Sequence, residues 1–249
     1  MGHRFELPQE AVVDATPEQV WEAIATGPGW DSWFMGRNSI APRPGGEVSF
    51  TIGDLTERST VTKWDPPHRF VATSAPGPDG YFHQFDYTLE PRERGKTEIK
   101  YVHSGMLGAE WEAEYEGMSE GDPMYFRKLV EYLEHFSGRF ATPVNAMGPN
   151  AGEDREAAMR AFRRALGLPD GVEEGDRVTL RPEGLEPIDG IVDVVSPSFF
   201  GVRTDDAMYR FIRGYEGSTI VGHHLFRGDV DQEREEAAWG DWLRRAFAP

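Results

Sequence analysis

The sequence predicts an α+β fold in which helices pack against an antiparallel sheet. Between residues 48 and 104, short segments alternate apolar and polar side chains, and Pro- and Gly-rich turns separate them. Because turns of this kind join consecutive strands as hairpins, the segments form a meander. Apolar residues at helical spacing precede and follow this meander. At 249 residues, the chain is long enough for two modest domains.

The first helix is predicted to begin after Thr16. The Thr16 hydroxyl is placed to cap the helix while Gln19 reaches back to the free amide, and Pro17 takes the first helical position. Gly and Pro at 27–29 end this helix. An aromatic cluster follows the break, made of Trp30, Trp33 and Phe34.

The meander and the later helices follow from the same patterns. Its strands are expected near 48–52, 57–65, 69–75, 81–90 and 97–104. Helical spacing resumes at residue 108, is interrupted at Gly121, Asp122 and Pro123, and continues in a long amphipathic helix over 123–140. Residues 141–152 have the composition of a linker, so we expect domains at 1–140 and 153–249.

Four motifs in the first domain carry a family resemblance. They are VDATPEQVWEAI at 13–24, GWDSWF at 29–34, PGGEVSF at 44–50 and VTKWDPPHRFVAT at 61–73. On their order, residues 5–140 resemble the SRPBCC (START-like) superfamily, specifically its AHSA1-like branch. The resemblance implies a helix-grip fold, in which a curved antiparallel sheet surrounds a long C-terminal helix and leaves a cavity between them. The family often has Trp after a Gly at the start of that helix, whereas Asp122 follows Gly121 here.

The second domain is predicted to be a smaller α+β unit. An ungapped offset of 130 residues pairs Gly45 with Gly175 and Phe70 with Phe200. Two interpretations follow: a shortened second copy of the helix-grip fold that lacks the opening strand, or an unrelated α+β cap.

Composition excludes several classes of partner and chemistry. A formal net charge of −17 disfavours nucleic acids and anionic membranes. The chain has no cysteine, which removes disulfides and thiol catalysis. We find no phosphate loop, dinucleotide fingerprint, signal peptide or membrane span, and therefore expect a soluble cytoplasmic protein without a cofactor. The oligomeric state is left open.

Strand parity suggests that two histidines meet inside the first domain. His83 and Phe85 share one face of their strand, and Tyr101 and His103 share one face of the next. A direct turn at 91–95 would set His83 opposite His103. Such a pair could bind a metal, transfer a proton, orient a polar ligand group or pack as ordinary core, with metal binding the minor option. Because no carboxylate lies at a suitable spacing, no metal site is predicted.

Aromatic side chains are more numerous than a small core requires, and they suit a planar apolar ligand. The acidic residues 110, 112, 114 and 116 are interpreted as a solvated helix surface, and His223 and His224 as neighbours on opposite faces of a strand. The predicted ligand-binding residues are Trp30, Trp33, Phe34, Phe50, Trp64, His83, Phe85, Tyr87, Tyr101, His103, Trp111 and Tyr125.

The leading functional hypothesis is a protein that binds a small hydrophobic or aromatic molecule between the sheet and the long helix. The resemblance also implies two alternatives. One is a cavity-based enzyme of the cyclase, dehydratase or hydrolase kind that uses the inward histidines as acid and base. The other is a chaperone-associated protein, since the AHSA1 name refers to an activator of the Hsp90 ATPase. No catalytic residue is assigned, and whether the protein is an enzyme stays open.

Overall fold

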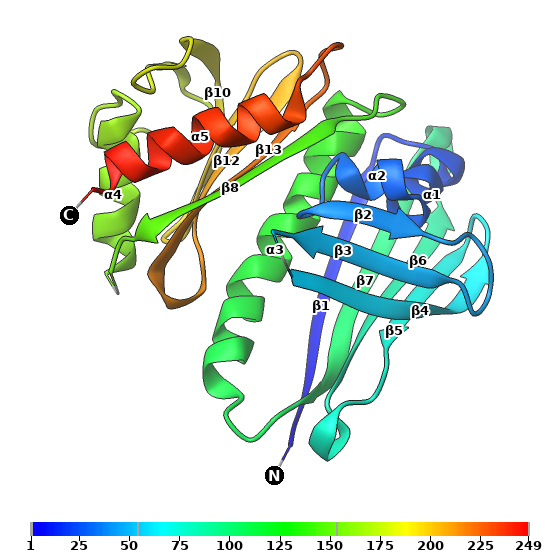
Figure 1. Cartoon of the computed structure of the whole chain (residues 1–249). Helices are drawn as coiled ribbons and strands as arrows, with labels where there is room; N and C mark the ends of the chain where they lie inside the picture. The colour runs from blue at the N-terminus through cyan, green and yellow to red at the C-terminus, as the bar shows by residue number, and fades with distance from the viewer. Residues whose placement is uncertain (1, 54, 153, 249) are drawn as a thin grey trace. The chain divides into compact units, whose positions relative to one another are not determined.

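A computed structural model describes residues 2–53, 55–152 and 154–248, and the chain divides into two compact units, Met1–Phe140 and Ala141–Pro249. Each unit is an antiparallel sheet with helices (Figure 1). In chain order, the elements of the first unit are β1 (His3–Val13), α1 (Pro17–Ala25), α2 (Gly27–Asp31), β2 (Arg37–Ile40), β3 (Glu47–Ile52), β4 (Leu55–Asp65), β5 (Arg69–Ser74), η1 (Pro78–Gly80), β6 (Phe82–Pro91), η2 (Glu93–Gly95), β7 (Thr97–Leu107) and α3 (Glu112–His135).

The predicted start of α1 is confirmed, and the segment after it is a second helix. The Gln19 backbone N–H donates to the Thr16 hydroxyl, and the Thr16 backbone N–H donates to the Gln19 side chain at 2.8 Å. The residues expected only to end the helix instead begin α2, which Thr26 caps by accepting the Gly29 N–H. Gly29 is required there, because a Cβ would lie 2.1 Å from the Glu22 carbonyl oxygen.

The first unit has the helix-grip architecture. Within the described residues its sheet has seven strands in the order β1-β7-β6-β5-β4-β3-β2, all pairs antiparallel. The long helix α3 runs along the sheet (Figure 1). Tyr101 of β7 stacks on Phe126 of α3, with ring centroids 6.0 Å apart. The predicted fold class is therefore confirmed.

The expected interruption of the long helix is wrong. Gly121, Asp122 and Pro123 lie inside α3, which continues from Glu112 to His135. Pro123 removes a single backbone hydrogen bond, and its position is exposed. The buried side chains that follow it, from Met124 to Leu133, hold that part of the helix by packing. Before it, the ring of Tyr115 contacts those of His3 and Trp111.

The predicted register between β6 and β7 is shifted by two residues. Phe85 pairs with His103, and His83 pairs with Gly105. The turn accounts for the shift. It is a short 3-10 segment centred on Arg94, which has φ 62°, and the last pair before it is Pro91 with Thr97. The two imidazoles still meet diagonally, with ring centroids 5.1 Å apart.

The second unit repeats the element order of the first with one strand fewer and with the single helix α4 in place of α1 and α2. Its sheet order among the described residues is β8-β13-β12-β11-β10-β9. Its elements are β8 (Thr142–Asn150), α4 (Arg155–Ala165), β9 (Arg177–Leu180), β10 (Ile188–Val195), β11 (Phe199–Arg203), β12 (Ala207–Arg213), η3 (Tyr215–Gly217), β13 (Ser218–Leu225) and α5 (Gln232–Ala246).

Two expectations about this unit are corrected. The stretch 141–152, interpreted as a linker, contains β8, which pairs with β13 along its length. The opening strand of the second copy is therefore present, and the missing strand is the counterpart of β2. Small and turn-forming residues are tolerated in β8 because it is an edge strand. Both units also carry a bulge in the same hairpin, between Val61 and Lys63 and between Val192 and Val194.

The second unit encloses its own hydrophobic core. Its largest buried side chains include Phe162, Phe200, Phe211 and Trp242.

In the described part of the chain, no helix is both long and apolar enough to cross a membrane.

Candidate functional site

Inward-facing side chains of the first unit are buried at one end of the grip and partly exposed at the other. Along β6, the inward-facing Tyr87 and Leu89 are buried, whereas His83 and Phe85 are only half-buried. The same change occurs along β3, from buried Val48 to half-buried Phe50. Since inward-facing side chains of a closed core would be buried throughout, this end of the grip is exposed to solvent. We call it the mouth.

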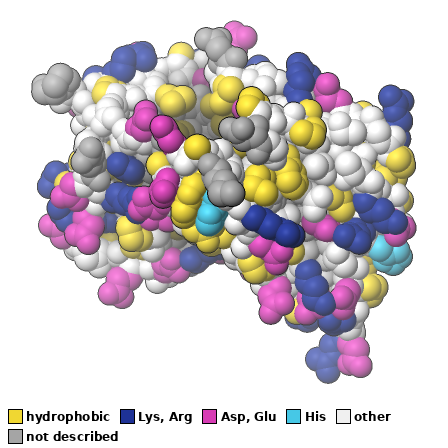
Figure 2. All heavy atoms as spheres, turned by 90° about the horizontal axis from the view of Figure 1, so that it is seen from below, with side chains coloured by type: hydrophobic (Ala, Val, Ile, Leu, Met, Phe, Trp, Pro, Cys, Tyr) yellow, Lys and Arg dark blue, Asp and Glu magenta, His cyan; other side chains and the backbone are white. Residues whose placement is uncertain are grey.

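The mouth lies where β6 and α3 begin. Figure 2 shows the face of the molecule at the end where β1 starts, with hydrophobic side chains lying among acidic and basic ones. Phe34 forms its inner wall, because its ring lies 5.7 Å from Phe50 and 5.3 Å from Tyr125. Phe85 contacts His103 at 4.5 Å between ring centroids.

The buried end of the grip is filled by packed rings. Trp30 and Trp33 are each 1% exposed, and their indole N–H groups donate to the carbonyls that end α1, at 2.6 Å and 2.9 Å. Tyr87 and Tyr101 stack with centroids 4.7 Å apart. These predicted ligand-binding residues therefore form the core behind the mouth.

The twelve predicted residues fall into three groups. Phe34, Phe50, His83, Phe85 and Tyr125 form the mouth, Trp30, Trp33, Tyr87, Tyr101 and His103 lie behind it, and Trp64 and Trp111 lie elsewhere. Trp64 packs on Trp21, and Trp111 stacks on His3 with centroids 3.6 Å apart.

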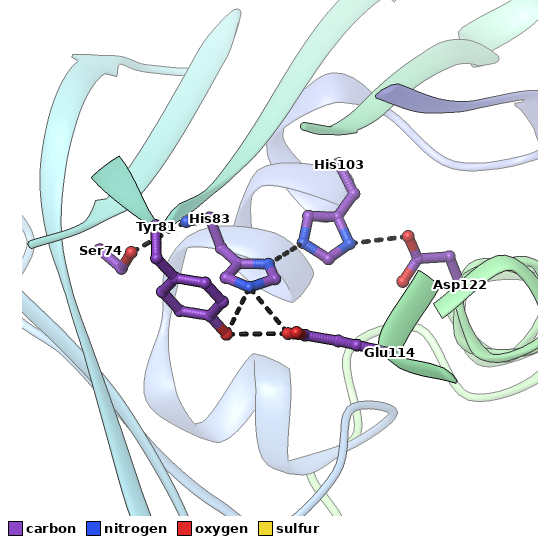
Figure 3. Close-up of polar contacts among 6 residues, drawn as sticks. All are labelled: Ser74, Tyr81, His83, His103, Glu114 and Asp122. Atoms are coloured by element: carbon purple, nitrogen blue, oxygen red, sulfur yellow. Dashed lines mark hydrogen bonds and ion pairs between the residues drawn. The ribbon is translucent and has the colours of Figure 1, made fainter. Parts of the chain in front are cut away.

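A continuous series of polar contacts leads from the core to the mouth (Figure 3). Nδ1 of His103 lies 2.8 Å from a carboxylate oxygen of Asp122, and its Nε2 lies 2.9 Å from Nδ1 of His83. Nε2 of His83 is 2.8 Å from the hydroxyl of Tyr81, which donates to Glu114 at 2.8 Å. We call Asp122, His103, His83, Tyr81 and Glu114 the polar chain.

Backbone geometry holds the polar chain in place. The His83 N–H donates to the Ser74 hydroxyl at 2.9 Å, which ties the start of β6 to the end of β5. The ring of Phe5 on β1 packs against both imidazoles, at 5.4 Å and 5.0 Å. Asp122 and Glu114 come from α3, so the helix and the sheet each supply part of the site.

Exposure increases along the polar chain. The side chains of His103 and Asp122 are 5% and 14% exposed, whereas those of His83 and Glu114 are 17% and 38% exposed. Burial and the neighbouring His103 lower the pKa of His83, against an opposing effect of Glu114 and Asp122. Burial and Glu114 raise the pKa of the Tyr81 hydroxyl. Neutral His83 and neutral Tyr81 therefore face the mouth at pH 7.

This arrangement is suited to hydrogen bonding and proton transfer. The Asp122 carboxylate orients the ring of His103 by accepting a hydrogen bond from its Nδ1, as second-shell carboxylates do for imidazoles. Among the described residues, no group of three His, Asp or Glu side chains is placed to hold a metal ion.

The predicted ligand-binding residues omit three members of the polar chain: Tyr81, which parity places on the same strand face as His83, and Glu114 and Asp122. Glu114 was interpreted as part of a solvated surface, but it contacts both Tyr81 and His83. Asp122 was noted only as a departure from the family pattern. A signal was available, because positions 114, 118 and 122 recur every four residues and so lie on one face of a helix.

The second unit has a histidine at the position that corresponds to His103. His223 lies against Tyr209, as His103 lies against Phe85. It is fully buried, and its ring lies 4.4 Å from that of Trp239 on α5. Its Nδ1 accepts the backbone N–H of Arg210 at 3.0 Å. This histidine is therefore a core residue.

The sequence profile of the family described as "Activator of Hsp90 ATPase homolog 1-like protein" matches residues 14–134. The first unit is an AHSA1-like domain. The predicted membership of the AHSA1-like branch of the SRPBCC superfamily is thereby confirmed for this part of the chain. Proteins of this kind are ligand-binding or chaperone-associated.

Solved structures also resemble the AHSA1-like domain. Protein MLL2253 from Mesorhizobium loti is 22% identical, with 52% of this chain and 96% of that one covered and a TM-score of 0.45. The Aha1 dimer from Colwellia psychrerythraea is 20% identical, with 52% of this chain and 96% of that one covered and a TM-score of 0.44. Protein BH1534 from Bacillus halodurans is 25% identical, with 53% of this chain and 99% of that one covered and a TM-score of 0.45. A search among curated proteins finds no match.

Proposed function

We propose that the AHSA1-like domain binds a small apolar molecule, with at least one aromatic ring, at the mouth of its grip. The observation that carries this proposal is the half-exposure of the inward-facing side chains Phe50, Phe85 and His83. Apolar side chains that face inward without being buried leave apolar surface for a ligand to cover.

The apolar area that a ligand covers sets the expected affinity. Covering about 200 Å² of apolar surface would supply ~5 kcal/mol at about 25 cal/mol per Å². Association entropy and side-chain ordering offset part of this energy, so a two-ring probe should bind with a Kd of about 0.2 mM or weaker. Polar contacts with the polar chain would then select among ligands of the same shape.

Two variants on one strand test the proposal. Phe85 faces the mouth and Phe82 faces the other side of the sheet, and both are half-buried. Naphthalene is titrated into the full chain and detected by its fluorescence. We expect Phe85→Ala to weaken binding about fivefold or more and Phe82→Ala to leave the Kd unchanged. Equal effects of the two substitutions, or no naphthalene binding by the unsubstituted chain, would show that the mouth does not bind apolar ligands.

Acid–base catalysis in the same mouth is the second candidate, and the contact between Asp122 and His103 favours it. Native mass spectrometry of the purified full chain identifies any co-purified small molecule. Incubating that molecule with the protein and with a His83→Phe variant separates the candidates. A product that only the unsubstituted protein forms supports catalysis, and an unchanged molecule supports binding alone.

A further inference from the structure

We propose that the ligand of the mouth carries a positively charged amine beside its apolar body, and that this amine lies next to the carboxylates of Glu114 and Glu57. This inference rests on the proposed function and names the class of ligand. The half-exposed rings of Phe50 and Phe85 are the reason to expect a ligand there, and the two carboxylates decide the charge of its polar group.

The polar chain offers the mouth only hydrogen-bond acceptors. Four contacts of 2.8 to 2.9 Å join its five groups, and each contact takes one hydrogen (Figure 3). If His103 is charged, every contact carries a hydrogen, and the last one is donated to Glu114. If His103 is neutral, the polar chain has one hydrogen fewer. In both states no hydrogen is left to donate to a ligand, and lone pairs of the Glu114 carboxylate face the mouth.

A second carboxylate faces the same space from the sheet. Glu57 of β4 pairs with Phe50 of β3, so both side chains lie on the inward face. Burial and Glu114 raise the pKa of the Tyr81 hydroxyl, and the charge of Glu57 adds to this effect, which places Glu57 near the outer end of the polar chain. Glu57 is exposed, and in the described part of the chain it takes part in no ion pair. Its charge is therefore available to a ligand.

Basic side chains lie away from this end of the grip. Among the described residues of the seven strands, no inward-facing position holds Lys or Arg. In α3, Arg127 and Lys128 come about 20 Å along the helix axis from Glu114. Nζ of Lys128 lies 5.1 Å from the ring centre of Tyr125, at the inner part of the mouth. A ligand ammonium group would therefore be repelled from the inner part and attracted to the outer end.

The charge at the outer end is negative in either state of His103. A charged His103 is offset by Asp122, whose carboxylate lies 2.8 Å from its Nδ1. His83 is neutral at pH 7.5, because burial and His103 lower its pKa. Glu114 and Glu57 then remain as two negative charges, which attract an ammonium group and repel a carboxylate. The aromatic rings of the mouth also favour a cation over an anion.

Four probes with one apolar body test this inference on the full chain: naphthalene, 2-naphthalenemethanol, 2-naphthylmethylamine and 2-naphthoate. The alcohol and the amine have nearly the same shape and differ in charge at pH 7.5. We expect the amine to bind about tenfold more tightly than the alcohol, and 2-naphthoate to bind more weakly than the alcohol. Equal Kd values for the amine and the alcohol, or tighter binding of 2-naphthoate, would overturn this inference while leaving the proposed function intact. Failure of all four probes to bind would instead refute the proposed function.

Substitutions distinguish the mouth from the acidic surface of the whole protein. Glu57→Gln and Glu114→Gln each remove one charge from the mouth, and each should lower the preference for the amine about threefold. Glu57→Gln changes an exposed side chain, so it tests the inference even where Glu114→Gln disturbs the fold. The matched control is Glu112→Gln, which removes an exposed charge from the opposite side of α3 and should keep the preference.

The control also identifies an effect of net charge alone. If Glu112→Gln lowers the preference as much as Glu57→Gln does, the attraction comes from the net charge of −17 and the inference is overturned. A preference that survives in Glu57→Gln and in Glu114→Gln would overturn it as well.

Salt provides an independent measurement. Attraction between charges weakens as ionic strength rises, because the Debye length falls from about 30 Å at 0.01 M to about 8 Å at 0.15 M. The Kd of the amine should rise over this range, whereas the Kd of the alcohol should stay within about twofold. A preference for the amine that is unchanged by salt, or that grows with it, would contradict the inference.

Discussion

Replacing Asp122 with alanine should destabilise the AHSA1-like domain by a predictable amount. The carboxylate is 14% exposed and lies 2.8 Å from Nδ1 of His103, whose side chain is 5% exposed. Removing it leaves a buried N–H without its acceptor, which costs about 2–3 kcal/mol for a hydrogen bond to a charged group. Alanine recovers about 0.5 kcal/mol through its higher helix propensity. The net loss should be ~2 kcal/mol.

The measurement must report on the first unit alone, because the chain has two compact units. Hydrogen exchange read by mass spectrometry on peptides from β6 and β7 meets this requirement. Protection there should fall by about 30-fold in Asp122→Ala, the factor that corresponds to ~2 kcal/mol, and peptides from β11 and β12 should be unaffected.

Two further variants complete the comparison. Asp122→Asn keeps an oxygen that accepts from His103 and should lose less than half as much stability. Glu112→Ala, an exposed acid on the same helix, should change protection by less than twofold. If Asp122→Ala leaves the protection of β6 and β7 unchanged, the carboxylate does not hold His103 in place.

Three other outcomes are expected. Asp193→Ala should lower the free energy of unfolding of the second unit by about 3–5 kcal/mol in urea titrations, because it leaves the fully buried guanidinium of Arg210 without its two-point partner at 3.0 and 2.8 Å; a loss below about 1 kcal/mol would contradict this. Gly201→Ala should destabilise the same unit by about 1–3 kcal/mol, since its Cβ would lie 2.6 Å from Asp193; unchanged unfolding would show that the backbone yields there. The pKa of His83 is lowered in the folded state, so the neutral side chain contributes stability at high pH. This contribution is lost as pH falls below the unfolded pKa of about 6.5. A His83→Gln variant should lack that part of the pH dependence in thermal unfolding.

Local chemistry made much of the fold predictable. The cap at Thr16, the meander and the inward face of β6 depend on residues within a few positions of one another, so sequence spacing is sufficient to identify them. The β8 segment was mistaken for a linker because an edge strand accepts Pro and Gly residues that also occur in loops. Pro123 was mistaken for a helix break because α3 is stabilised by the tertiary packing of buried side chains that follow it, which local spacing does not show.

The site was less predictable, because it depends on distances between elements far apart in sequence. Parity correctly placed His83 and His103 on inward faces, but the conformation of Arg94 set the register of the hairpin between them. The roles of Asp122 and Glu114 depend on how α3 lies over β6 and β7, which no local pattern specifies. Their spacing on one helix face indicates only that they act on the same side.

The internal repeat gives an independent reason to assign the site to the first unit. Both copies place a histidine on their last strand, against a ring of the preceding strand. In the second copy the histidine meets the Trp239 ring and is fully buried, and a backbone N–H satisfies its Nδ1. In the first copy it meets a carboxylate, and a second imidazole continues the contacts to the solvent-exposed mouth. The corresponding histidines therefore have different surroundings: His223 packs in the core of the second unit, whereas His103 belongs to a series of polar contacts that reaches the mouth of the first. The difference comes from the helix that covers each histidine, through Trp239 of α5 or Asp122 of α3.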